Sequence, residues 1–266
     1  MRLFGRISIY GEYLTGVVPG LIAISDLYLG TAEHANMSEC QGYDPKRDKV
    51  AALLRARGFA TQSKLAGNLP LGYGLAGSTV LAFLHLHDQV PVEAAVQIAT
   101  ECDEIIHGFP PSGVDAMACL RQRGGFYHKR QWADTDLPRF EYTLALFPKL
   151  TFRPLAEIQA TIGSNGRLLW PLADQLTNRV VSAGELDYEV LLEYCRVLLN
   201  LRVYSPVACE VVRACLNQRI VAKGIGGLHE KALLVISPQR GQQETDVMRV
   251  LSSFRPMLVF PGKGGR

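Results

Sequence analysis

The sequence contains Leu69-Pro70-Leu71-Gly72-Tyr73-Gly74-Leu75-Ala76-Gly77-Ser78-Thr79, a glycine-rich turn that runs directly into an apolar segment, Val80 to His87. The apolar segment predicts a buried helix, and the glycines before it leave backbone N–H groups accessible to a ligand. A helix N-terminus adds partial positive charge, so the turn predicts an anion site, with a nucleotide phosphate as the expected anion. Ser78 and Thr79 add hydroxyl oxygens where a phosphate-bound Mg2+ would need a ligand.

The turn differs from two common nucleotide-binding motifs. No Gly-Lys-Ser/Thr follows its glycines, so it is not a Walker A loop. No acidic residue follows about 20 residues later at the end of a strand, so it is not a Rossmann fingerprint. A plain turn without a ligand is the alternative for any isolated glycine cluster.

The composition indicates a sizeable core and a mild charge. Of the 266 residues 48% are hydrophobic, and the net charge of +3 is scattered, so we expect no nucleic-acid surface. No apolar run reaches the length of a membrane span, and Met1 to Phe4 does not resemble a secretory signal. The six cysteines form no Cys-x-x-Cys pair, which disfavours zinc. We therefore expect a cytoplasmic protein with reduced thiols and no membrane partner.

Hydrophobic periodicity predicts mixed strands and helices without strict alternation, which favours an α+β fold. Strands are expected at 2–10, 17–29, 126–130, 140–147, 219–222, 232–237 and 257–260. Helices are expected at 49–57, 80–87, 91–106, 154–162, 168–183, 188–201, 206–217 and 244–254. The polar, proline-containing segment 134–138 suggests a domain boundary, with domains at 1–136 and 137–266.

A second motif carries two carboxylates, Glu104 and Asp115, on either side of a Pro/Gly loop. Their spacing is too long for one helix face, so each must reach a site separately. One carboxylate could hold Mg2+ and the other could accept a proton from an attacking hydroxyl. A solvated Glu104 and a helix-capping Asp115 are the alternative. The preceding helix, 91–106, is expected to bury one apolar face, made of Ala95, Ile98, Cys102 and Ile105.

A third motif, Ile220 to Gly227, carries glycines between two expected strands, where they would allow close approach of the backbone to a ligand. A plain hairpin connection is the alternative.

Together these segments resemble the GHMP kinases, the superfamily of galactokinase, homoserine kinase, mevalonate kinase and phosphomevalonate kinase. The first family motif resembles Gly5 to Tyr13, the phosphate loop resembles Pro70 to Thr79, and the C-terminal glycine motif resembles Lys223 to Gly227. The Glu-x6-Pro-Ser-Gly-x-Asp motif, closest to the mevalonate-kinase-like members, is matched at Glu104, Pro111, Ser112, Gly113 and Asp115. The resemblance covers nearly the whole chain in the family's order.

This resemblance implies a two-domain fold, with a ribosomal-S5-like N-terminal domain that binds nucleotide and a ferredoxin-like C-terminal domain. It implies ATP and Mg2+ as cofactors, Asp115 and Arg6 as catalytic residues, and Ser78 and Glu104 as metal ligands. The implied nucleotide-binding residues are Pro70, Gly72, Gly74, Leu75, Ala76, Gly77, Ser78 and Thr79. The implied substrate-binding residues are Glu12, Tyr13, His107, Ser112, Gly113 and Gly226.

The chain departs from the family pattern at four of these positions, one of which is Gly77, where the family has the first serine of the loop. Arg6 stands where the family has the lysine that pairs with the catalytic aspartate, and Tyr13 stands where it has a histidine. Ala76 replaces a loop glycine and brings a Cβ to a position where either close backbone approach or positive φ is expected.

The expected function is transfer of the γ-phosphoryl group of ATP to a small alcohol: mevalonate-like, an amino alcohol or a sugar. A non-catalytic nucleotide-binding or metabolite-binding relative is one alternative, and a diphosphomevalonate-type decarboxylase is another. A homodimer is compatible with the sequence, which does not identify the acceptor alcohol.

Overall fold

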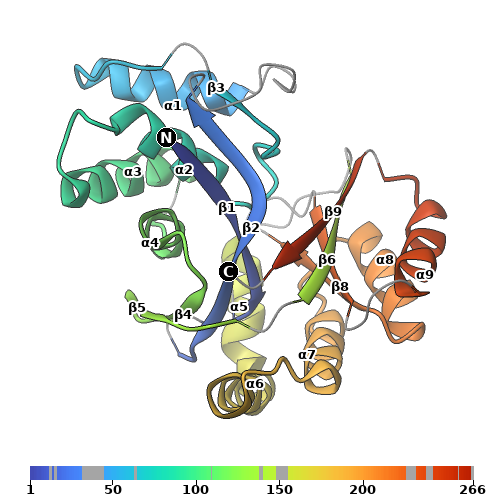
Figure 1. Ribbon diagram of the computed structural model, residues 1–266. Coiled ribbons are helices and arrows are strands. Elements are labelled where there is room, and N and C mark those ends of the chain that lie inside the picture. Colours follow the sequence, from blue (N-terminus) through green and yellow to red (C-terminus); the bar gives the residue numbers. More distant parts are fainter. Residues whose placement is uncertain are drawn as a thin grey trace. The chain divides into compact units, whose positions relative to one another are not determined.

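The computed structural model describes residues 1–11, 14, 17–31, 45–62, 65–108, 110–137, 140–147, 155–225, 232–237, 242–256 and 258–264. Its strands are β1 (Arg2–Tyr10), β2 (Gly20–Thr31), β3 (Leu65–Gly67), β4 (Gly125–His128), β5 (Gln131–Asp134), β6 (Phe140–Leu146), β7 (Val221–Ile225), β8 (Ala232–Ser237) and β9 (Leu258–Gly264). Its helices are α1 (Pro45–Ala56), α2 (Gly77–Leu86), α3 (Val92–His107), α4 (Val114–Arg121), α5 (Leu155–Asn165), the 3-10 turn η3 (Gly166–Leu168), α6 (Trp170–Ala183), α7 (Tyr188–Asn200), α8 (Pro206–Asn217) and α9 (Gln242–Ser252). Figure 1 labels these elements.

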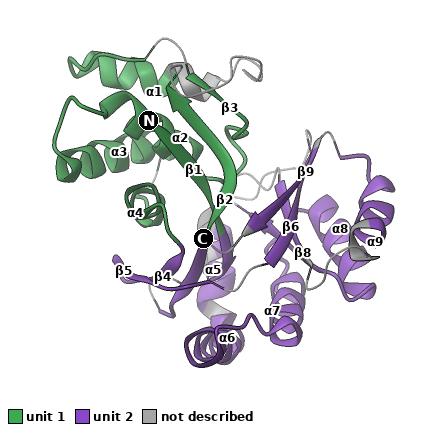
Figure 2. Ribbon diagram, in the orientation of Figure 1, with its two compact units in different colours: residues 1–7, 24–123 green, residues 8–23, 124–266 purple. Residues whose placement is uncertain are grey.

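The chain forms two compact units that interleave in sequence (Figure 2). Unit 1 contains residues 1–7 and 24–123, and unit 2 contains residues 8–23 and 124–266. The expected boundary after residue 136 is a single cut, whereas β1 and β2 each pass from one unit to the other. The expected division into domains 1–136 and 137–266 therefore stays a prediction.

Unit 1 is built around α2, in which every residue is buried. Its sequence explains this, because it is apolar on all sides, and such a helix must be surrounded by other elements. Helices α1, α3 and α4 all pack against α2. The buried helix predicted after the glycine-rich turn is therefore confirmed.

The first sheet has the order β1-β2-β4-β5, with β3 also paired to β2. Leu29 lies opposite Gly67 in the β2–β3 pair, and Gly20 lies opposite Tyr127 in the β2–β4 pair. Strand β1 is terminal in this order, so one of its edges is available to groups from outside the sheet.

Unit 2 contains an antiparallel sheet with the order β7-β8-β6-β9. Leu144 of β6 lies between Leu234 of β8 and Phe260 of β9. Counting these strands along the chain gives the order 2-3-1-4, with helices between the first and second strands and between the third and fourth. This is the β-α-β-β-α-β arrangement of a ferredoxin-like domain. Helices α8 and α9 lie side by side next to the sheet (Figure 1).

Most predicted elements are present, and the largest differences concern short ones. The strand expected over 126–130 ends at His128, because Lys129 and Arg130 have φ of 47° and 64° and form a two-residue turn into β5. Strands β3 and β5 were not predicted, since three or four residues carry too little periodicity to be distinguished from a loop.

The five cysteines in the described part of the chain are free thiols. Among the described residues no helix is both long and apolar enough to cross a membrane.

Candidate active site

The glycine-rich turn adopts the backbone conformations that its sequence predicts. Gly72 and Gly74 have φ of 82° and 77°. Ala76 has φ 63° and ψ 25°, so the positive φ, one of the two expectations for this position, is found. The left-handed region costs a residue with a Cβ about 1–2 kcal/mol, so the turn keeps this shape at a price in stability.

The N-terminal end of α2 keeps its first backbone donors outside the helical ladder. Val80 N–H donates to Ala76 C=O at 2.9 Å, so the N–H groups of Gly77, Ser78 and Thr79 precede that bond. Ala76 is the N-cap residue and provides no side-chain hydrogen bond. This end of α2 therefore has the properties of an anion site, with N–H groups and the positive end of the helix dipole together.

Strand β1 holds the turn close to its backbone. Arg6 N–H donates to Leu75 C=O at 3.2 Å. A Cβ on Gly5 would lie 2.5 Å from Leu69 Cδ1 and 3.0 Å from Leu75 O. A larger residue at position 5 would therefore require the Leu69 side chain to rearrange and Leu75 O to shift.

Arg6 also reaches the carboxylate that the sequence assigns to catalysis. Its Nε donates to Asp115 Oδ1 in an ion pair between β1 and the first turn of α4. The two side chains are 11% and 22% exposed, so the pair is shielded from bulk water but remains accessible. Such shielding strengthens the attraction between the charges.

A second carboxylate lies at Ser78, and it is Asp103. Ser78 Oγ donates to Asp103 Oδ1 at 2.6 Å, and both residues are buried. His107 Nε2 lies 3.2 Å from the same oxygen, one helical turn further along α3. Burial alone raises the pKa of Asp103, but contact with His107, the Ser78 hydrogen bond and the charge of Arg6 together lower that pKa below its ordinary value of 3.8.

The sequence assigns Glu104 as a metal ligand together with Ser78, whereas the carboxylate in contact with Ser78 in the structure is the neighbouring Asp103. Glu104 is exposed, as is Ile105, which was expected to be buried. The buried residues of α3 are Ala95, Ala99, Cys102 and Asp103. Its inner face is thus rotated relative to the predicted one, and the i, i+4 spacing of Asp103 and His107 is the signal that could have identified the carboxylate.

The remaining predicted site residues fall into three groups. Ser112 is exposed, and its Oγ accepts a hydrogen bond from Val114 N–H at 3.4 Å. Gly113 has φ 86° and begins α4, so it determines how the chain enters the helix that carries Asp115. Glu12, Tyr13 and Gly226 lie outside the described residues.

Thr79, also assigned to the phosphate loop, is buried in the first turn of α2. Its Oγ1 has no hydrogen-bond partner among the described residues. A buried hydroxyl without a partner is costly, which marks this turn as a place where a ligand or water would be stabilising.

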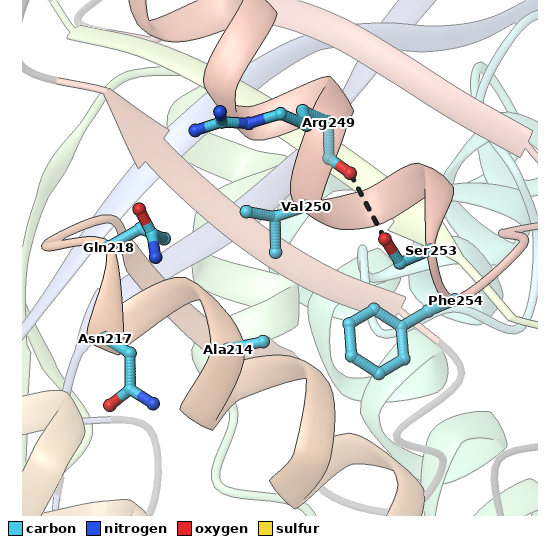
Figure 3. Close-up of a pocket in the computed structure, with 7 residues that line it drawn as sticks. All are labelled: Ala214, Asn217, Gln218, Arg249, Val250, Ser253 and Phe254. Carbon is cyan, nitrogen blue, oxygen red and sulfur yellow. Dashed lines mark hydrogen bonds between the residues drawn. The ribbon is translucent and has the colours of Figure 1, made fainter.

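A cavity of about 460 Å³ lies elsewhere, between α8 and α9 in unit 2 (Figure 3). Val250 and Phe254 form much of its apolar lining, and Arg249 and Gln218 lie at its edge. None of the described site residues lines this cavity. Within the described ranges no three His, Cys, Asp or Glu side chains form a metal-binding cluster.

Comparison with known proteins gives matches by structure only. No family model matches the sequence, and no curated protein matches it. The Methanococcus jannaschii mevalonate kinase superposes with a TM-score of 0.70 at 11% identity, over 100% of this chain and 98% of that one. L. major mevalonate kinase in complex with R-mevalonate has a TM-score of 0.67 at 13% identity, over 98% and 94%. Streptococcus pneumoniae phosphomevalonate kinase in complex with phosphomevalonate and AMPPNP has a TM-score of 0.62 at 13% identity, over 98% and 99%.

These similar structures are GHMP kinases and span the whole chain. The two-domain α+β fold of that superfamily, expected from the sequence motifs, is therefore confirmed. At these identities the likeness establishes the fold, and the chemistry has to be argued from the side chains.

Proposed function

We propose that this protein is an ATP-dependent phosphotransferase that transfers the γ-phosphoryl group to the hydroxyl of a small alcohol. The observation that carries the proposal is the double role of Arg6. Its backbone N–H binds the glycine-rich turn at Leu75, and its side chain binds Asp115. One residue thereby links the phosphate-binding element to the carboxylate that would act on the acceptor.

The turn and the start of α2 would bind the ATP phosphates through backbone N–H groups. The N–H groups of Gly77, Ser78 and Thr79, which precede the first helical bond of α2, support this role, because oriented amides stabilise phosphate charge without needing basic side chains. The positive-φ backbone at Gly72 and Gly74 creates the concave turn in which such groups converge.

Ser78 and Asp103 would hold Mg2+. Their oxygens lie 2.6 Å apart in a buried position, and hydroxyl and carboxylate oxygens are the hard donors that Mg2+ prefers. Magnesium is commonly held by one or two carboxylates plus substrate phosphates, so this pair is sufficient on the protein side. The ion would neutralise charge on the transferring phosphoryl group.

Asp115 would orient the acceptor hydroxyl and accept its proton, while Arg6 offsets the negative charge beside it. Arginine keeps its own proton at any physiological pH, so Arg6 acts through charge and geometry alone. Most of the rate in phosphoryl transfer comes from positioning and charge stabilisation, which is what fixed side chains of this kind provide.

The acceptor would be a small alcohol of the mevalonate or phosphomevalonate type. This choice rests on the neighbours whose structures contain R-mevalonate or phosphomevalonate. We further propose that the enzyme works in the cytoplasm without a nucleic-acid partner. The proposal includes a homodimer, which is an expectation from the sequence.

The test is Mg2+-dependent ADP formation from ATP with a panel of small alcohols. The panel contains mevalonate, phosphomevalonate, homoserine, threonine, pantoate and several sugars. We expect turnover with one acceptor, and a loss of about 10³-fold in kcat for Asp115→Asn, a loss typical of removing a general base. Turnover that survives this substitution would overturn the role of Asp115. Failure of the protein to bind ATP would overturn the role of the turn.

A non-catalytic nucleotide-binding relative is the second candidate, favoured by the changes at Arg6, Ala76 and Gly77. Against it, Ala76 adopts the positive φ that the position requires, at a cost in stability. ATP binding by calorimetry, without ADP formation with any acceptor, would support this candidate over the kinase.

A further inference from the structure

Gln122 forms a bracket between the end of α4 and strand β1. Its side-chain Oε1 accepts a hydrogen bond from Phe4 N–H at 2.8 Å. Its Nε2 donates to Cys119 C=O at 3.1 Å and to Ala118 C=O at 3.3 Å. One amide thus binds the last carbonyls of the helix and a backbone donor of the strand.

The bracket joins the same two elements as the Arg6–Asp115 ion pair. N–H groups of residues two apart in a strand point to the same edge, so Phe4 and Arg6 present theirs along one edge of β1. The first binds Gln122, and the second binds Leu75 of the glycine-rich turn. The edge therefore sets the spacing between the turn and α4.

The backbone of Gln122 makes this bracket notable. As the C-cap residue of α4 it has φ 48° and ψ 28°, a conformation that favours glycine. Glycine would be free of the conformational penalty but would lack the side chain that makes these three contacts. The bracket exists here at a position where a side chain is disfavoured.

Helix α4 is short, and its two ends are held in different ways. It has eight residues, with Asp115 in its first turn and Gln122 just past its last. The helix packs against α2 and α3, and it is attached to β1 at both of its ends, by the ion pair of Asp115 and by the contacts of Gln122.

We infer that Gln122 is a positioning residue, which keeps α4 in register with β1 and so holds the Asp115 carboxylate at its place beside Arg6. The inference rests on the proposed function for its consequence in catalysis. Its structural part, that the bracket aligns the ion pair, can be tested without any turnover.

The catalytic test uses Gln122→Met, which keeps the length of the side chain and the backbone penalty but removes the contacts. Gln97→Met is the matched control, because Gln97 is an exposed residue of α3 that contacts Glu101. We expect Gln122→Met to lower kcat about tenfold or more, with KM for ATP unchanged, since small misplacements of reacting groups are costly. Gln122→Glu, which keeps the acceptor for Phe4, should retain more activity than Gln122→Met. A kcat equal to that of Gln97→Met would overturn the inference.

A double-substitution experiment separates positioning from general stability. If Gln122 acts through Asp115, Gln122→Met should lower kcat in the wild-type background and leave the residual rate of Asp115→Asn unchanged. Equal fold losses in both backgrounds would overturn the inference, because they would indicate an effect that bypasses the carboxylate.

Urea unfolding tests the role of Gln122 without any measurement of activity. The shift in unfolding midpoint caused by Asp115→Asn should be smaller in the Gln122→Met background than in wild type, because the ion pair is already misaligned there. Equal shifts would overturn the inference. If the wild-type protein shows no turnover with any alcohol, the proposed function fails, and these midpoints still decide the role of Gln122.

Discussion

Two polar clusters bind strand β1 at successive positions, and they differ in what surrounds them. The first, in unit 1, binds residues 4–6 through Gln122, Leu75 and Asp115. The second, in unit 2, binds residues 8–11. Its Lys223 Nζ donates to Ser8 C=O at 3.0 Å and Ile9 C=O at 3.3 Å, and Tyr194 Oη accepts from Gly11 N–H at 2.9 Å.

The difference in accessibility indicates different roles. Lys223 is fully buried and donates to backbone oxygens, whereas the Arg6 and Asp115 side chains remain 11% and 22% exposed. Burial also raises the pKa of Tyr10, whose hydroxyl pairs with Thr177 at 2.8 Å in the second cluster. Partly exposed charged groups can contact a ligand, whereas buried hydrogen bonds to the backbone hold β1 in place. Substitutions in the first cluster should therefore reduce activity, and those in the second should reduce stability.

After Asp115→Asn, the next largest effect is expected for Asp103→Asn, at the carboxylate that accepts a hydrogen bond from Ser78 and feels the charge of Arg6 in the first cluster. Removing the charge beside Ser78 should lower kcat about 10²-fold and raise the Mg2+ concentration needed for half-maximal rate. Glu104→Gln is the matched control, because that neighbouring residue is exposed, and it should change kcat by less than about twofold. A larger loss for Glu104→Gln than for Asp103→Asn would restore the original sequence-based assignment.

In the second cluster, Lys223→Met should lower the free energy of unfolding by about 2 kcal/mol. The substitution leaves the carbonyls of Ser8 and Ile9 without this donor in a buried position, and each such loss typically costs about 1–3 kcal/mol. Urea unfolding measures the change, with the exposed Lys49→Met as control. The kcat of the remaining folded protein should change little. A large loss of kcat at unchanged stability would contradict the assignment of a structural role to the second cluster.

A smaller change in stability is expected from a substitution in the glycine-rich turn. Ala76→Gly should raise the free energy of unfolding by about 1 kcal/mol, because the residue already has φ 63°. Ala82→Gly, in the middle of the buried helix α2, should instead destabilise by about 1 kcal/mol or more. Thermal unfolding of the pair checks the prediction, which requires shifts of opposite sign.

The smallest effect is a pH dependence of stability from Asp103. Its pKa is lowered in the folded protein, so folding favours the ionised form, and this contribution is complete above the unfolded value near 3.8. It disappears as the pH falls through the lower folded value. The stability difference between wild type and Asp103→Asn should therefore be constant above about pH 5 and shrink below pH 4. A difference that grows on acidification would contradict the assigned direction.

Much of this architecture could be predicted from the sequence, because the hydrophobic periodicity of a long segment indicates both its secondary structure and its buried face. Helix α8 was predicted with its observed bounds, and so were β1 and β8. The Arg6–Asp115 contact was also expected, because the resemblance to the family places Arg6 at the residue that pairs with the catalytic aspartate, although the two residues are 109 positions apart.

The choice between Glu104 and Asp103 could not be made from the motif alone. Adjacent residues on a helix point about 100° apart, so a small error in the buried face changes which carboxylate enters the site. Ile105 looked like a core residue by hydrophobicity and is 46% exposed. The bracket at Gln122 was equally invisible, since nothing in local sequence indicates that a side-chain amide meets a strand 118 residues earlier.

The interleaving of the two units has a consequence for synthesis on the ribosome. Ser8 is made 215 residues before Lys223, the side chain that binds its carbonyl. At about 5–20 residues per second, the end of β1 waits on the order of ten to forty seconds for this contact. Residues 1–7, by contrast, can complete their unit once residue 123 has emerged. The two parts of β1 thus gain their contacts at different times. Its N-terminal part can fold with unit 1 while the residues that contact its C-terminal part are still being translated.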